Sequence, residues 1–121
     1  MSGIFETLEK IKARPGMYLG KPSVNHLFMF IEGYSLARQE CGFEPTVSES
    51  EFYGEFQPWL QNRLKITTSN SWAALIQFQC GDEREALSYF FQLLDEFQNR
   101  PQPIDRSMTE HRVEQAAIYV N

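Results

Sequence analysis

Few side chains in this sequence are of the types that perform chemistry at protein active sites. The histidines are His26 and His111, and the cysteines are Cys41 and Cys80. No two of them have the spacing of metal ligands, so we expect no metal site. Cys41 falls where a helix should end, which disfavours a thiolate, and Cys80 lies in an apolar run typical of a core. No glycine-rich phosphate loop is present. The sequence therefore nominates no catalytic residue and no cofactor, and indicates a protein that is not an enzyme.

The charged side chains are better suited to binding. The chain has 16 acids and 11 bases, a net charge of −5. Residues 39–62 carry five glutamates and no base, and more acids follow at 82–85 and 95–96. A negative surface attracts a basic protein partner and repels the phosphate backbone of nucleic acids. A solvated loop and an ordinary helix surface would give the same pattern, and this alternative stays open.

The candidate partner-binding residues come from both acidic stretches. Tyr53 lies among the acids and points away from the helix face formed by Phe52, Phe56 and Trp59, so its ring can serve as an anchor. None of these candidates is assigned to the core. They are Glu49, Glu51, Tyr53, Glu55, Asp82, Glu83 and Glu85.

The length and composition predict one domain in a reducing compartment. A chain of 121 residues and 14.1 kDa buries enough surface to fold without disulfides or metals. The N-terminal residues lack the apolar run of a signal peptide, and no segment has the length of a membrane span. We expect a cytoplasmic protein that is a monomer or a weak dimer.

Apolar residues spaced three and four apart predict helices along most of the chain. The run from Trp72 to Cys80 is compatible with a strand or a helix, and flanking cap residues favour a helix. The helix at 24–40 is apolar over most of its circumference, which predicts a central position. The expected helices are a first one capped by Ser2 and ended by Pro15-Gly16, one at 24–40 capped by Ser23, one from a Ser48/Glu51 capping box to Leu64 that is kinked or split at Pro58, one at 72–80, and one at 83–98 capped by Asp82.

These elements predict the fold class. We expect an all-α, single-domain bundle of five or six helices whose core spans residues 1–100. A C-terminal extension at 101–121 would belong to the same domain and add one short helix, from a cap at 107–110 to Tyr119.

One segment resembles a known family. Residues 11–20 read IKARPGMYLG. This string is similar to the opening of the ATPase domain of the gyrase B subunit and of its type II topoisomerase relatives, which carry a similar Arg-Pro-Gly-Met-Tyr-Ile-Gly segment. In that family, the following helix supplies an acid and an asparagine for magnesium and water. Here residues 30–35 keep an acid, Glu32, but no asparagine, and no Asp-x-Gly-x-Gly loop follows. We expect a structural turn in which Met17 and Tyr18 pack on the next helix, without ATP binding.

A broader resemblance covers residues 8–97. The turn at Arg14–Gly20, the apolar helix ending near Gly33-Tyr34, the aromatic stretch at 52–59 and the helix ending in LLDEF resemble small bacterial proteins. Some of these are similar to immunity proteins encoded beside polymorphic or contact-dependent growth-inhibition toxins. The resemblance implies a cytoplasmic inhibitor that binds one toxin domain tightly, such as a basic nuclease. The alternative is a small helical adaptor or regulatory domain that binds another cytoplasmic protein.

Overall fold

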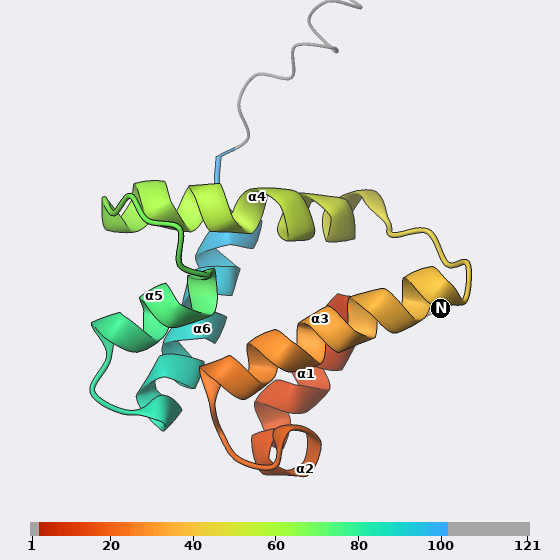
Figure 1. The fold of residues 1–121 in the computed structure, drawn as a ribbon, viewed down its shortest axis with the longest axis horizontal. Helices are drawn as coiled ribbons and strands as arrows, with labels where there is room; N and C mark the ends of the chain where they lie inside the picture. The colour runs from red at the N-terminus through yellow and green to blue at the C-terminus, as the bar shows by residue number, and fades with distance from the viewer. Residues whose placement is uncertain (1–2, 102–121) are drawn as a thin grey trace, which may run out of the picture.

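The computed structural model describes residues 3–101, which form helices and no strand (Figure 1). The helices of this part of the chain are α1 (Ile4–Ala13), α2 (Pro15–Leu19), α3 (Val24–Glu40), α4 (Val47–Leu64), α5 (Trp72–Gln79) and α6 (Glu83–Gln98). The prediction of an all-α bundle of five or six helices is confirmed. The expected cap Ser2 and the expected short helix after residue 101 lie outside the described residues.

The caps predicted from the sequence for three of the helices are confirmed. The Ser23 side chain accepts a hydrogen bond from the backbone N–H of His26 at 3.2 Å and starts α3. Ser71 does the same for α5 through the N–H of Ala74. Asp82 starts α6, whose bounds are those expected. Such hydrogen bonds satisfy the first N–H groups of a helix, which have no partner within it.

The turn after α1 contains a helix that the sequence analysis missed. Arg14 leaves the helical conformation, but Pro15 then begins the five-residue helix α2. Proline suits a first helical position because its missing N–H would have no partner there. Leu19 packs into the core, whereas the Met17 side chain is 69% exposed and that of Tyr18 36%. The prediction that Met17 packs on the next helix was therefore wrong, whereas Tyr18 is mostly covered and its part of the prediction stays a prediction.

Helix α3 is not central along its whole length, contrary to the prediction. Val24, Leu27 and Ile31 are buried, but Met29 and Leu36 are mostly exposed. Figure 1 shows α3 in front of α1, and within the described residues no helix covers the side of α3 that faces the viewer. The apolar composition of α3 therefore predicted more burial than the helix has.

The start of α4 also differs from the prediction. The capping box is Thr46 with Glu49, two residues before the expected pair Ser48 and Glu51. The helix then runs to Leu64 with Pro58 inside it, so it is not split in two.

Aromatic rings hold α4, α5 and α6 together. Phe56 of α4 lies with its ring centroid 5.5 Å from that of Trp72 on α5 and 5.8 Å from that of Phe90 on α6. At the surface, Arg63 of α4 and Glu96 of α6 form a two-pronged ion pair, with Nε 2.8 Å from Oε1 and Nη2 3.2 Å from Oε2. The core therefore holds α4 from its first turns, where Glu49 and Phe52 are buried, to Leu60.

Candidate partner-binding site

The turn between α3 and α4 places an aromatic ring at the surface. Gly42 has a φ of +83°, and its N–H bonds the carbonyl of Gln39 at 3.0 Å. The N–H of Phe43 bonds the carbonyl of Arg38 at 2.9 Å, which completes a Schellman motif. Glycine is favoured at the left-handed position of this motif. The chain therefore turns sharply, and the Phe43 side chain is left 47% exposed.

Glu49 is the main correction to the candidate residues. Its side chain is only 2% exposed, so it is not part of an acidic surface. Oε1 accepts the backbone N–H of Thr46 at 2.9 Å, and Oε2 accepts that of Ile4 at 2.8 Å. One carboxylate thus caps its own helix and also the start of α1. The cap residue of α1 is Gly3, where a Cβ would overlap Glu49 Oε2 and force this carboxylate to move.

The charge of Glu49 is stabilised in this position. Burial alone would raise the pKa of its carboxyl, but hydrogen bonds from the backbone N–H groups of Ile4 and Thr46 lower it, as does the charge of Arg38. Together they bring the pKa below its usual value near 4.5. Glu49 is therefore a structural anion in the fold at neutral pH.

A cleft of about 330 Å³ lies between the end of α3 and the start of α4. Tyr53 lines it and remains 37% exposed. Burial and the charge of Glu49 raise the pKa of the Tyr53 phenol, although a hydrogen bond with the Ser35 side chain acts in the opposite direction. The guanidinium of Arg38 lies 5.5 Å from the Tyr34 ring centroid and 4.9 Å from that of Phe43. The side chains that line the cleft include Ser35, Arg38, Phe43, Glu44, Glu49 and Tyr53.

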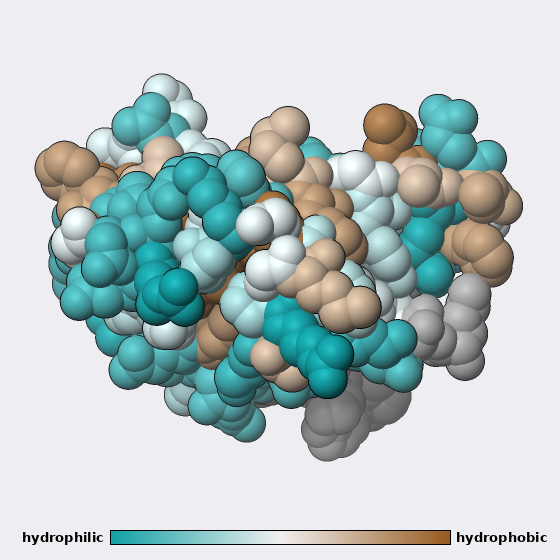
Figure 2. All heavy atoms as spheres, turned by 90° about the horizontal axis from the view of Figure 1, so that it is seen from below, coloured by the Kyte–Doolittle hydropathy of each residue, from teal (hydrophilic) through white to brown (hydrophobic). Residues whose placement is uncertain are grey.

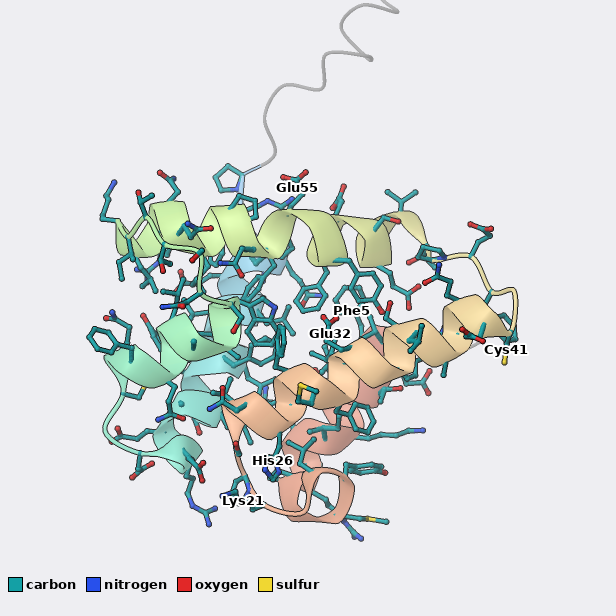
Figure 3. The ribbon with its side chains drawn as sticks, viewed as in Figure 1. Phe5, Lys21, His26, Glu32, Cys41 and Glu55 are labelled. Carbon is teal, nitrogen blue, oxygen red and sulfur yellow. The ribbon has the colours of Figure 1, made fainter. Side chains whose placement is uncertain are left out.

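The other two acids predicted on α4 are at the surface. Glu51 is partly exposed, and its Oε1 lies 3.8 Å from Nη2 of Arg100. Glu55 is exposed and points away from the rest of the fold (Figure 3). Because Tyr53 faces the cleft, it and Glu55 occupy different sides of α4. The exposed acids therefore lie along the outer side of the helix, and the tyrosine lies at its inner edge.

The acids at the start of α6 belong to a different region. Asp82 Oδ1 accepts the backbone N–H of Glu85 at 2.7 Å, and Glu85 Oε1 accepts that of Gly81 at 3.0 Å. Glu83 Oε1 lies 3.2 Å from Nζ of Lys21. Figure 1 shows the start of α6 at the opposite end of the molecule from the start of α4. The two groups of predicted residues therefore do not form one surface.

Sequence reasoning missed the apolar side chains beside the cleft. Val47, the first residue of α4, is 77% exposed, and Phe43 lies four residues before it. Figure 2 shows hydrophobic side chains on the surface at the end of the molecule where α3 ends. A signal was present in the sequence, because both residues fall outside the periodic apolar pattern of their neighbours.

Of the histidines and cysteines, His26, Cys41 and Cys80 lie in the described part of the chain, and His111 lies outside it. His26 Nδ1 lies 2.9 Å from the carbonyl oxygen of Leu19 and so ties α3 to the end of α2. Burial raises the pKa of the Cys80 thiol, and the nearby charges of Glu85 and Asp82 raise it further. Within this range, no cluster of three potential metal ligands occurs and no helix is long and apolar enough to cross a membrane.

Comparisons of the chain with protein-family models, with curated proteins and with solved structures gave no match. The resemblances to the gyrase B opening and to immunity proteins therefore stay predictions.

Proposed function

We propose that this protein is an inhibitor that neutralises a cognate toxin domain by tight protein–protein association. Its binding surface would be the end of the molecule between α3 and α4. The chain would act without catalytic residues, by covering the surface through which the toxin works. The choice of a toxin as partner rests on the resemblance over residues 8–97, and the choice of the surface rests on its geometry.

One observation carries the choice of surface. Three large apolar side chains, Phe43, Val47 and Tyr53, are exposed within 11 consecutive residues. The same stretch contains acids and no base. Exposed apolar side chains bordered by charge are typical of protein interfaces, where rings fill pockets and charges select the partner. Tyrosine is among the residues that contribute most to such interfaces.

The acids and the tyrosine would act at different stages of binding. Glu44 and Glu55 extend the negative field of this end into solvent, and charges act over about 8 Å at physiological salt. They would raise the rate at which a basic partner arrives. Tyr53, already fixed by Ser35 and the cleft wall, would lose little conformational freedom on binding and would slow dissociation.

The first experiment identifies the partner by affinity capture from the source cells, followed by mass spectrometry. A captured toxin domain whose activity is abolished by the purified protein would support the proposal. A captured housekeeping enzyme or receptor, with no loss of a toxic activity, would favour the helical adaptor instead.

The second experiment measures binding kinetics of the captured partner with two variants. We expect Glu44→Lys/Glu55→Lys to slow association at least tenfold at low salt and much less at high salt, because salt screens the field. We expect Tyr53→Ala to leave association nearly unchanged and to speed dissociation about 30-fold, as removal of a hot-spot ring worth about 2 kcal/mol would do.

A control variant with the same charge change separates local from overall charge. Glu9 and Glu32 are exposed residues on α1 and α3. Glu9→Lys/Glu32→Lys should therefore alter association far less than the Glu44→Lys/Glu55→Lys pair. Equal rates for the two charge-reversed pairs, in variants with native melting temperatures, would remove the interface from this end of the molecule. The start of α6 would then be tested next, through Glu83→Lys.

A further inference from the structure

A second concave surface lies away from the proposed interface. It is a groove of about 650 Å³ between the α1–α2 turn and α6. Lys21 lies in the turn between α2 and α3, near its edge, and is labelled in Figure 3. The apolar walls of the groove are two prolines, one that begins α2 and one that follows it, and two side chains of α6, and two cations also line it. These residues are Lys12, Pro15, Pro22, Arg84, Leu87 and Phe91.

The groove has the opposite charge from the rest of the molecule. Residues 3–22 hold four bases and two acids in a chain whose net charge is −5. The ammonium of Lys12 lies 5.8 Å from the Phe91 ring centroid. Within residues 3–101, neither Lys12 nor Arg84 has an ion-pair partner. Both charges are therefore available to an anionic group.

The acids near this groove already have partners. Asp95 is the one acid in its lining, and Asn99 Nδ2 donates a hydrogen bond to its Oδ1 at 3.2 Å. Glu83, one residue before Arg84, pairs with Lys21 at 3.2 Å. The groove is thus lined by two cations without an ion-pair partner, Lys12 and Arg84, and by one acid, Asp95, which is hydrogen-bonded to the next turn of α6.

We propose that this groove binds an acidic peptide segment of another protein, with one apolar side chain between its carboxylates. The apolar side chain would lie against the prolines and Phe91, and the carboxylates would meet Lys12 and Arg84. Charge complementarity favours this occupant, because the two cations attract an acidic peptide and a short peptide can bind within the groove. A nucleic acid would extend beyond the groove onto a surface that repels it.

The length of the groove along α6 sets the length of the peptide, because Lys12 lies over Phe91. Arg84 and Phe91 are seven residues apart on α6, which is about 10 Å along a helix. An extended chain covers this distance in about three residues. A segment with glutamates on both sides of a single leucine therefore spans the groove. Since the groove and the α3–α4 end use different residues, this proposal and the proposed function can fail separately.

The test uses the full-length protein labelled with nitrogen-15 and the capped peptide Glu-Glu-Leu-Glu-Glu as the probe. We expect saturable shifts of the backbone amide signals of Lys12, Gly16, Leu87 and Phe91 in NMR spectra, and weaker affinity at higher salt. The peptide Glu-Glu-Ser-Glu-Glu should bind at least tenfold more weakly, because it keeps the charge and loses the apolar contact.

Two variants locate the binding. Lys12→Glu/Arg84→Glu should weaken the leucine peptide at least tenfold, whereas Lys10→Glu, an exposed residue of α1 outside the groove, should change the affinity less than threefold. Melting temperatures confirm that both variants are folded. The proposal is overturned if no amide shift saturates, if the double variant binds as well as the native protein, or if a thymidine pentanucleotide binds as tightly as the peptide.

Discussion

Replacing Glu49 with alanine should lower the free energy of unfolding by about 3 kcal/mol. The carboxylate accepts the backbone N–H groups of Thr46 and Ile4, and alanine would leave both without a partner at a buried position. This carboxylate joins the start of α4 to the start of α1, which is far away in the sequence. Urea denaturation of the native and variant proteins measures it directly.

Two further variants sharpen this result. Glu55→Ala, an exposed position on the same helix, should change the free energy of unfolding by less than about 0.5 kcal/mol. Glu49→Gln should lie between the two, because an amide has one oxygen and can accept only one of the N–H groups well. If Glu49→Ala is no more harmful than Glu55→Ala, the carboxylate does not cap α1.

The stabilisation by Glu49 should also depend on pH. Its pKa in the folded protein lies below the usual value near 4.5, so the unfolded chain takes up a proton more readily than the folded one. The stabilisation is therefore fully present above the unfolded pKa and is lost as the pH falls through the folded pKa. We expect the difference in unfolding free energy between the native protein and Glu49→Gln to be constant near neutral pH and to shrink on acidification below 4.5. A pH-independent difference would contradict the assignment.

Replacing Phe56 with alanine is expected to have the largest effect, a loss of about 3 to 5 kcal/mol. Its side chain is 1% exposed, and the ring centroids of Trp72 and Phe97 lie within 5.5 Å of its own. The substitution removes the ring from the contact of α4 with both α5 and α6 and leaves a cavity that these large neighbours cannot close. The loss approaches the total stability of a small domain, about 5 to 15 kcal/mol.

The chain provides a matched control for this substitution. Phe78 is 83% exposed, so Phe78→Ala should change the melting temperature little. If Phe56→Ala does not fold, Phe56→Leu keeps part of the volume and should still unfold at a lower denaturant concentration than Phe78→Ala. Equal midpoints for the variants at 56 and 78 would show that the rings around Phe56 do not stabilise the fold.

The helix bounds that could be predicted are those with a strong signal in neighbouring residues. Ser23 and Gly42 at the two ends of α3, and Asp82 at the start of α6, satisfy free backbone groups within a few residues of themselves. Because these interactions need no distant partner, the sequence by itself determined α3 and α6, and with them the all-α class. The cap at Ser71 likewise decided α5 in favour of a helix.

The candidate site was predicted only in part, because which glutamate is buried depends on contacts between residues that are far apart in the sequence. Thr46–Glu49 and Ser48–Glu51 fit the capping-box pattern equally well in sequence. In the folded chain, Glu49 has a further donor, the N–H of Ile4, 45 residues away, and so it is Glu49 that is buried.

The exposure of the remaining candidates also followed from the packing of helices. The turn between α3 and α4 left Tyr53 at the edge of a cleft. Leu36 is exposed because no described helix covers the outer side of α3, although this helix is apolar over most of its circumference. The sequence alone thus determined which segments are helical, through short-range hydrogen bonds and apolar periodicity. Only the tertiary structure decided which acids are surface charges and which one is a buried cap, because that depends on which helix ends meet in space.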